Sequence, residues 1–234
     1  EDDEAATIAI DSVSGGGASE SGSQSVAVTI TENESEPTVT LATSATSIAE
    51  NAGSSLTLTA TLSGATDQNV TVVLGTSGTS TEGTDYTDGS GNVDDITITA
   101  GSTTGTVSFT PTDDSIYEGN ETATIAISSV TGEASESGTQ AVTITITENE
   151  SAPTVTLTTS AKSIAENAGS SLTLTATLSG ATNADVTVAL STSGAATEGT
   201  DYTDGSGNID DIVISAGSTT GTVSFTPSDD SVYE

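Results

Sequence analysis

The sequence predicts an all-β protein made of tandem antiparallel β-sandwiches, and three observations carry this prediction. First, apolar residues alternate with Thr or Ser in short segments such as SLTLTATL (55–62), GTVSF (105–109) and AVTITIT (141–147). Strict alternation is typical of a strand that has one buried face. Second, 48 threonines supply β-branched side chains for the other face. Third, Gly, Asn, Asp and Ser separate the segments and no stretch has a helical period, so we expect no significant helix.

The overall composition taken alone favours a different class. Leu, Ile, Val and Phe make up 44 of the 234 residues, and the formal net charge is −33. Few aliphatic residues with a high net charge are typical of disordered chains. Because the apolar residues alternate regularly instead of being scattered, we expect a folded protein.

The charge and the missing residue types exclude several functions. Lys162 is the single basic residue, so a cationic surface for nucleic acid or anionic lipid is excluded. The chain has no Cys, which excludes disulfides and thiolate chemistry. It also lacks His and Trp, and Thr46 replaces Lys162 in the other repeat, so we expect no enzyme. No apolar run has membrane-spanning length, and we expect no membrane insertion.

An internal repeat defines the expected domains. Residues 35–118 align with 151–234 without a gap, and 69 of the 84 positions are identical; residues 1–34 match 118–150 with one extra glycine. A repeat of 116 residues with about seven strands has the size of one immunoglobulin-like sandwich, and Pro37 and Pro153 suit its first strand. We therefore expect the last two strands of a repeat in 1–34, a complete repeat in 35–150, and in 151–234 a repeat that lacks its last two strands.

Two interpretations of this phase stay open. In one, the chain is a window of a longer array. In the other, residues 1–34 of a neighbouring copy complete the repeat at 151–234 and cover its open sheet edges, which are disfavoured when left exposed. Repeated head to tail, such a contact does not close and builds a filament.

Acidic residues gather in four loops of the complete repeat. Loops distant in sequence converge at the ends of a sandwich, and counting strand reversals places these four at one end. Without Lys or Arg nearby they require a cation, and Ca²⁺ accepts six to eight oxygen ligands in flexible geometry. The absence of His and Cys argues against zinc, and Mg²⁺ usually retains its waters. The loops contain Glu50, then Asp85, then Asp113, Asp114 and Glu118, and finally Glu148 and Glu150.

The same segments resemble the Calx-β domain, found in sodium–calcium exchangers and in tandem arrays of bacterial surface proteins. The resemblance rests on SIAENAG, on EGTDYTDGSGNVDDITITAGSTTGTVSFTPTDD and on DDSIYEGNETATIAI, and it covers essentially the whole repeat. It implies a Calx-β type sandwich with calcium ligands at Glu50, Asp85, Asp113, Asp114 and Glu118, with linker contributions from Glu148 and Glu150. The counterparts in the next repeat are Glu166, Asp201, Asp229, Asp230 and Glu234.

We expect a structural function from these observations. The chain is interpreted as a calcium-binding segment of an extracellular or cell-surface array, stalk or filament, in which Ca²⁺ stiffens loops and inter-domain linkers. Its expected partners are neighbouring repeats or other copies of the same chain. The alternative is a ligand-binding adhesin module, although no long insertion or aromatic patch marks a recognition surface. Asp88, Asp94 and Asp95 have a simpler interpretation, since Asp is an ordinary turn residue.

Overall fold

The computed structural model describes residues 3–89 and 91–230, and within them the chain is all-β, as predicted. These residues include no helix with the length and apolar character needed to cross a membrane. The chain divides into two compact units. Unit 1 comprises Glu1–Thr46, Ser54–Thr110 and Ala123–Ile144, and unit 2 comprises Ser47–Gly53, Pro111–Thr122 and Thr145–Glu234.

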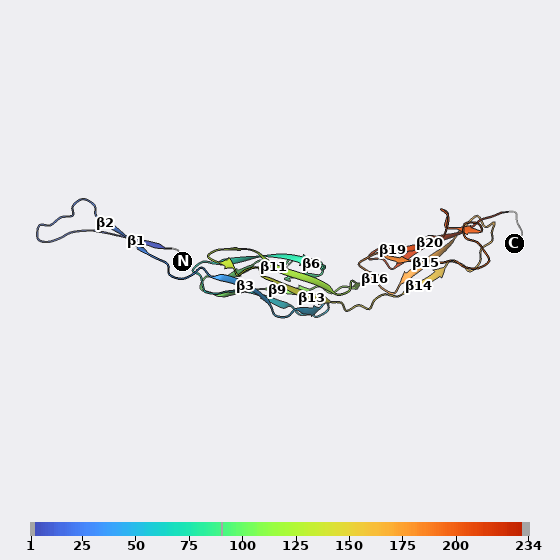
Figure 1. Ribbon diagram of the computed structural model, residues 1–234, viewed down its shortest axis with the longest axis horizontal. Coiled ribbons are helices and arrows are strands. Elements are labelled where there is room, and N and C mark those ends of the chain that lie inside the picture. Colours follow the sequence, from blue (N-terminus) through green and yellow to red (C-terminus); the bar gives the residue numbers. More distant parts are fainter. Residues whose placement is uncertain (1–2, 90, 231–234) are drawn as a thin grey trace. The chain divides into compact units, whose positions relative to one another are not determined.

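Two five-stranded sheets form in the complete repeat (Figure 1). One has the order β4 (Ser47–Ala49), β13 (Ala141–Thr147), β11 (Glu121–Thr131), β6 (Val70–Gly78), β8 (Ile96–Ile98). The other has the order β12 (Ser135–Glu136), β3 (Thr38–Thr43), β5 (Leu56–Leu62), β9 (Thr104–Pro111), β7 (Tyr86–Thr87). The pairs β3–β5, β5–β9, β6–β8 and β6–β11 are antiparallel, whereas β4 runs parallel to β13 and β12 parallel to β3.

The core follows the alternation read from the sequence. In β5, Leu56, Leu58, Ala60 and Leu62 are buried while the intervening threonines are more accessible, so the strand has one apolar face. Phe109 of β9 is also buried and stacks on a buried tyrosine of β7 with 4.6 Å between ring centroids. The other sheet contributes the buried side chains Val70, Val72, Ile96, Ile98, Ile125 and Ile144.

One glycine is required by close strand packing. Gly105 of β9 lies against β8, and a Cβ atom placed there would be 2.7 Å from both Ile96 Cγ2 and the Thr97 carbonyl oxygen. Gly221 has the same role in the next repeat, where the added atom would be 2.5 Å from the Val213 carbonyl oxygen. Both positions therefore need a residue without a side chain.

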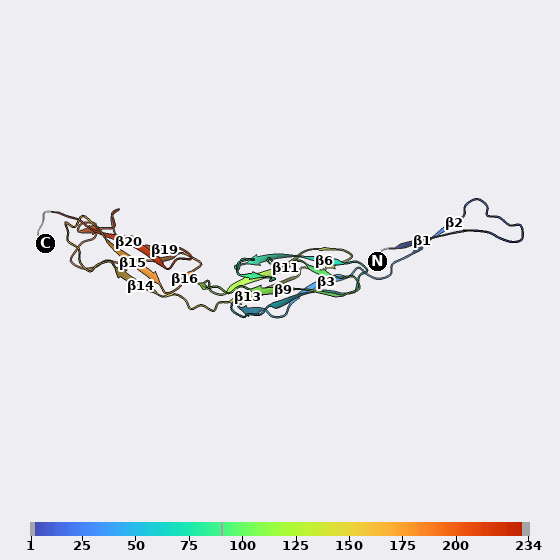
Figure 2. The same cartoon turned by 180° about the vertical axis from the view of Figure 1, so that it is seen from behind.

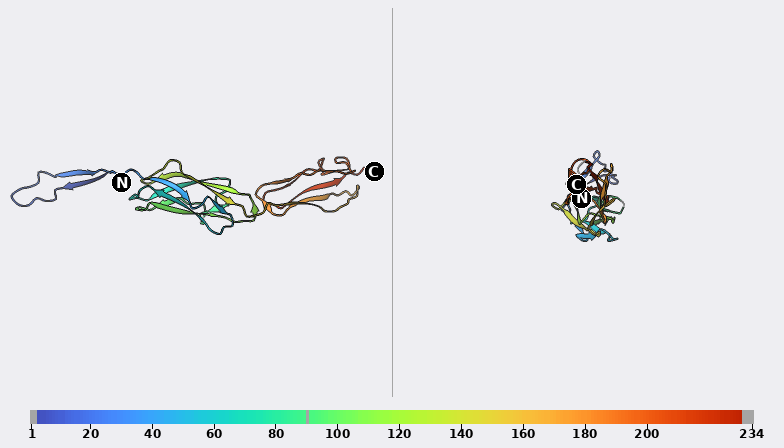
Figure 3. Two further views of the ribbon diagram at one scale, coloured as in Figure 1. Left: turned by 60° about the horizontal axis from the view of Figure 1, so that its bottom comes forward. Right: turned by 90° about the vertical axis from the view of Figure 1, so that its right-hand side faces the viewer.

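Residues 4–30 form a separate two-stranded hairpin in unit 1 (Figure 3). Strands β1 (Glu4–Ala9) and β2 (Ser25–Ile30) are antiparallel, with Ile8 opposite Val26. Every residue of both strands is exposed. The apolar face of this hairpin thus has no covering layer among the described residues.

The repeat at 151–230 has less regular structure, although its sequence nearly repeats that of 35–114 (Figure 2). One sheet has the order β14 (Val155–Thr159), β15 (Leu172–Leu178), β20 (Thr220–Pro227), β18 (Tyr202–Thr203), and a second pairs β17 (Val186–Val188) with β19 (Ile212–Ile214). A short parallel pair joins β10 (Ile116–Tyr117) to β16 (Ala181–Thr182). The fully buried part of the core is a small cluster of Ala176, Leu178, Ile212 and Ile214.

Candidate metal centre

The parallel pair β4–β13 brings two acidic residues to one end of the sheet. Ala49 lies opposite Thr147 in this pair, so Glu50 and Glu148, the next residues of each strand, leave the sheet side by side. The Glu50 N–H extends the ladder by donating to the Thr147 carbonyl oxygen at 3.0 Å. The pairing register therefore explains why residues about a hundred positions apart meet.

Three carboxylates converge at this place. Glu50, Glu148 and Glu150, all in unit 2, each offer an oxygen atom, and these atoms lie within 4.8 Å of one another. Glu50 is 7% exposed and the other two are half-buried. We call this group the Glu50 cluster. Three of the residues that the sequence analysis expects as ligands thus lie together in the structure.

The Glu148 carboxylate accepts hydrogen bonds from the surrounding loops. Its Oε2 accepts the N–H groups of Glu118 at 2.6 Å and Gly119 at 2.8 Å, and its Oε1 accepts those of Asn149 and Glu150, both at 2.9 Å. Burial opposes ionisation of this carboxyl, but these donors outweigh it and lower the pKa of Glu148 to about 2. Glu148 therefore holds a stable negative charge that fixes the linker to the loop at 118–119.

The pKa values of Glu50 and Glu150 are raised, in contrast to that of Glu148. Burial, together with the charges of Glu148, Glu150 and Asp114, raises the pKa of Glu50 to about 7, although the Asp114 N–H donates to its Oε1 at 3.3 Å. A shared hydrogen bond with Glu148, followed by burial, raises the pKa of Glu150. When ionised, the buried Glu150 Oε2 has no hydrogen-bond donor. Both carboxyl groups therefore hold a proton more readily than a free glutamate, because burial and the neighbouring carboxylates disfavour their ionised forms.

The loop before β10 supplies the next predicted ligands. Asp113 and Asp114 are exposed, and the Asp114 Oδ1 accepts the Ile116 N–H at 2.7 Å, which closes a tight turn. Asp113 is near enough that its charge also raises the pKa of Glu150. The turn leads into β10, which pairs with β16, and the Asn183 N–H donates to the Tyr117 carbonyl oxygen at 3.3 Å. The acidic loop is thus fixed to the following repeat within unit 2.

Asp85 belongs to unit 1 and is placed by a local turn. Its carboxylate accepts the Thr81 N–H at 2.5 Å, and its own N–H donates back to the Thr81 carbonyl oxygen. Glu82 in the same turn accepts the Val93 N–H at 2.7 Å and the Thr76 hydroxyl at 2.9 Å. Asp94, beside Asp88, has a raised pKa because of the Asp88 charge.

The counterparts in the next repeat keep the local hydrogen bonds, and Glu166 alone differs in burial among those that the structure describes. Asp201 accepts the Thr197 N–H at 2.6 Å, and the Asp230 N–H donates to Glu166 Oε1 at 3.2 Å. However, Glu166 is exposed, because no strand equivalent to β13 covers it among the described residues. Asp229 is exposed as well, and Glu234 lies outside the described residues.

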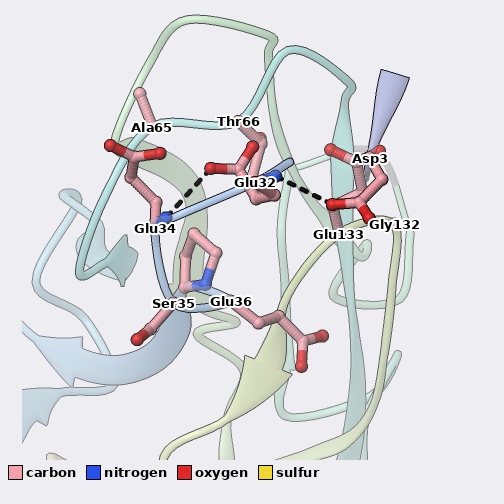
Figure 4. Close-up of a pocket in the computed structure, with 10 residues that line it drawn as sticks. Asp3, Glu32, Glu34, Ser35, Glu36, Ala65, Thr66, Gly132 and Glu133 are labelled. Atoms are coloured by element: carbon pink, nitrogen blue, oxygen red, sulfur yellow. Dashed lines mark hydrogen bonds between the residues drawn. The ribbon is translucent and has the colours of Figure 1, made fainter. Parts of the chain in front are cut away.

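A second acidic site, which the sequence analysis did not name, lies in unit 1 (Figure 4). A cavity of about 750 Å³ is lined by Asp3, Glu32, Glu34 and Glu133, among others. Glu32 Oε1 accepts the N–H groups of Asn33 and Glu34, as Glu148 does in its linker. The repeated TENE at 31–34 and 147–150 is the signal that identifies this second linker.

The pKa values of Glu32 and Glu34 shift in opposite directions, as those of Glu148 and Glu150 do. Glu32 takes hydrogen bonds from Glu34 and from backbone N–H groups, which lower its pKa to about 2, and the shared bond with Glu32 raises the pKa of Glu34. The Glu32 N–H donates to Asp3 Oδ1 at 2.8 Å, where Glu148 uses Asn120 Oδ1 at 3.0 Å. The two linkers therefore share the same hydrogen bonds around their first glutamate.

The donor set of the Glu50 cluster suits a hard dication. It offers only carboxylate oxygens, one of them buried without a donor, and its three side chains lie within reach of one ion. Ca²⁺ prefers such oxygen ligands, whereas zinc and softer metals prefer nitrogen and sulfur. The residues that are present therefore fit a calcium ion.

Comparison with known proteins gives the family. The model of the Calx-beta domain matches residues 32–150 and again 148–234. The chain belongs to the Calx-beta domain family. Its match to the tandem pair supports the predicted fold class, an immunoglobulin-like β-sandwich of the Calx-β type.

Solved structures give weaker likenesses. The apo-form Calx CBD1 domain is 16% identical with a TM-score of 0.40, and the alignment covers 48% of this chain and 99% of that one. CBD12 from CALX1.2 is 20% identical with a TM-score of 0.39, covering 80% and 73%. The calcium binding domain CBD12 of CALX1.1 is 19% identical with a TM-score of 0.39, covering 76% and 70%. A search of curated proteins found no match.

Proposed function

We propose that this protein is a structural, calcium-binding segment of an extracellular array and has no catalytic role. The Glu50 cluster carries the proposal: three carboxylates meet where β4 and β13 end, and a buried oxygen of Glu150 has no donor. Bound Ca²⁺ would supply the positive charge that this site lacks. Membership of the Calx-beta family supports the same metal.

The position of the cluster supports a role at the linker. Glu50, the loop at 111–122 and the linker that begins at Thr145 belong to unit 2 together with the following repeat. Glu148 already ties Glu118 and Gly119 to the linker, and β10 pairs with β16. Neutralising the carboxylates removes their mutual repulsion, so these segments hold one arrangement and the linker bends less.

The proposed location follows from the chemistry of the site. Ca²⁺ sites of extracellular modules have dissociation constants of about 10⁻⁴ to 10⁻³ M, far above cytosolic calcium concentrations. In the Glu50 cluster Glu148 and Glu150 are only half-buried, and both oxygens of Glu148 already accept backbone N–H groups. Both features favour a calcium affinity in this low range. Such a site fills only outside the cell, where we place the array.

Calorimetry of EDTA-stripped protein tests the proposal, with Ca²⁺ titrated in and Mg²⁺ as a control. A ligand at 100 times its dissociation constant stabilises the folded state by about 2.7 kcal/mol, so Tm should rise by about 10 °C with Ca²⁺. Glu50→Gln and Glu150→Gln should each remove most of this rise. Asp67→Asn is the matched control, because it removes the same charge and Asn183 already occupies that position in the other repeat.

Stiffening has a separate measurement. Small-angle X-ray scattering should give a narrower distribution of molecular dimensions with Ca²⁺ than with EDTA, and Glu150→Gln should abolish the difference. An unchanged melt in Ca²⁺ would refute the metal site. A calcium-dependent melt with unchanged scattering would keep the site and refute the stiffening.

A further inference from the structure

An Asp–Gly pair at residues 204–205 lies in the turn between β18 and β19. Gly205 is exposed, has a φ of 103°, and a Cβ atom placed there would meet nothing within 4 Å. The backbone nitrogen after such an aspartate is open to contact with the carboxyl group, because glycine has no side chain to shield it. The sequence has one other Asp–Gly pair, Asp88–Gly89, at the same position of the complete repeat.

The backbone nitrogen of Gly205 has a hydrogen-bond acceptor beside it. Its N–H donates to Thr203 Oγ1 at 2.9 Å. A backbone nitrogen that forms a bond to a carboxyl carbon has to lose its proton, and a hydroxyl group that already accepts this proton can pass it to water. Thr203 is therefore placed to assist such a step.

The carboxyl group of Asp204 has a proton donor beside it. Asp204 and Asp210 share a hydrogen bond, which requires that one of the two carries a proton. The charge of Asp204 and then this bond raise the pKa of Asp210, whereas hydrogen bonds from the Ser206 N–H and hydroxyl lower the pKa of Asp204. The proton thus lies on Asp210 and faces an oxygen atom of Asp204.

The complete repeat has the same arrangement. The Gly89 N–H donates to Thr87 Oγ1 at 2.9 Å, and Gly89 also has a φ of 103°. The charge of Asp88, followed by a hydrogen bond shared with it, raises the pKa of Asp94. The two repeats differ in strand length and burial, so these bonds depend on the local sequence of the turn.

We propose that Asp88 and Asp204 are sites of self-modification, at which the chain forms a succinimide ring and then isoaspartate. At the second site the Gly205 nitrogen bonds to Asp204 Cγ and one Cγ–O bond breaks. The oxygen leaves as water, with one proton from the nitrogen and one from Asp210. Water then opens the ring at either carbonyl, which gives aspartate or isoaspartate, and the new carboxylic acid returns a proton to Asp210. The reaction needs no reagent except water.

Isoaspartate changes the course of the main chain. The backbone then runs through the side-chain carbon, so the turn gains one carbon atom and the carboxylate moves to a shorter branch. In the complete repeat this turn connects β7 of one sheet to β8 of the other. The change accumulates with time and leaves the acidic residues of the Glu50 cluster unaltered, so it marks the age of a molecule independently of calcium.

Prolonged incubation of the full chain tests the proposal, at neutral pH and physiological temperature in EDTA. Electron-transfer fragmentation of proteolytic peptides distinguishes isoaspartate from aspartate at each position. We expect isoaspartate at residues 88 and 204 and none at Asp67 or Asp185, which precede other residue types. A synthetic peptide of residues 200–212 is the control for the sequence alone. Isoaspartate in the peptide but at neither site of the folded chain would overturn the proposal, as would its absence from both.

Two variants test the proton donors within one molecule. Asp210→Asn keeps the Asp–Gly pair but has no carboxylic proton, so the yield at residue 204 should fall at least about tenfold, since general acid catalysis contributes about 10² to 10⁴. The yield at residue 88 of the same chain should stay unchanged. Asp94→Asn should give the reverse pattern.

Asp211→Asn is the matched control for Asp210→Asn. It removes the same charge from the next residue, and its amide oxygen can still accept the Leu190 N–H that Asp211 Oδ1 accepts at 2.9 Å. Most of the yield at residue 204 should remain in this variant. A yield that survives Asp210→Asn, or that falls equally in Asp211→Asn, would overturn the role of Asp210 as proton donor.

Discussion

Residues 35–114 and 151–230 have nearly the same sequence and reach different degrees of order. In the first, β6 extends over nine residues, whereas its counterpart β17 has three. In the first, Ser47–Ala49 form β4, whereas residues 163–165 form no strand. In the first region β6 pairs with β11 and β4 pairs with β13, whereas the described residues include no equivalent partner strands for the second region.

The comparison also separates two sources of structure. Features made within residues 35–110 recur in both regions, such as the aromatic stack and the β5–β9 pairing with its counterpart β15–β20. Features that involve β11 and β13 do not recur among the described residues of the second region: Glu50 is buried, whereas its counterpart Glu166 is exposed. Local sequence therefore specifies the first set, and long-range pairing specifies the second.

Hydrogen exchange should show the largest contrast. Amides in residues 73–78 lie in a strand that pairs with β11, whereas residues 189–194 have no such partner among the described residues, so exchange should be about a thousandfold slower in the first segment. Mass spectrometry of peptides from dilute protein measures this. Similar rates in monomeric protein would contradict the view that pairing with β11 orders β6.

Truncating one leucine in each region compares how much the packing of that side chain contributes to stability. Leu41→Ala should destabilise the complete repeat by about 2–4 kcal/mol because it leaves a cavity, whereas Leu157→Ala, at an exposed position, should cost less than about 1 kcal/mol. The opening free energies of residues 56–62 and 172–178, from hydrogen exchange, report each region separately. Equal losses would mean that Leu157 is already covered.

The pH dependence of the metal-free protein compares Glu50 with Glu166. The folded pKa of Glu50 is raised to about 7 from 4.5, so its contribution is fully favourable below pH 4.5 and is lost as the pH rises through 7. The loss is at most about 3 kcal/mol, since one pKa unit corresponds to 1.36 kcal/mol. Glu50→Gln should flatten denaturant-measured stability between pH 5 and 8 in EDTA.

Glu166→Gln is the control for this measurement, because Glu166 is exposed and should leave the slope unchanged. Glu148 acts in the other direction: its pKa is lowered to about 2, so its contribution is present above pH 4.5 and is lost on acidification. A slope between pH 5 and 8 that survives Glu50→Gln would assign it to another group.

The smallest effect should be the same in both regions. Ser55 and Thr110 share a hydrogen bond of 2.7 Å, and Ser171 and Thr226 share one of the same length. Ser55→Ala and Ser171→Ala should each cost about 0.5–1 kcal/mol, since both bonds are exposed and neutral. A large difference between them would show that pairing with β11 and β13 also affects the stability of the sheet that contains β5 and β9.

The sequence predicted the fold class because alternation and turn residues are local signals, and β5 follows them residue by residue. It placed four acidic loops at one end of the sandwich from the count of strand reversals, and the structure brings Glu50, Glu148 and Glu150 of two of these loops together. It did not predict that the Glu148 carboxylate accepts four backbone N–H groups, or that Glu32 and Glu34 form a linker with the same hydrogen bonds in unit 1. Those features depend on the detailed course of the loops, which no periodicity encodes.

The parallel pairing of β4 with β13 determines how the repeat bears tension. Tension from the N-terminal side of the repeat first reaches β3, which pairs with β5 and β12. Once it reaches β4, the parallel pairing means that β4 and β13 are drawn in opposite directions along their length, so their hydrogen bonds are loaded in shear. Glu50 and Glu148 stand directly after these strands. A cation bound by both carboxylates would oppose the separation of these two strands under such tension.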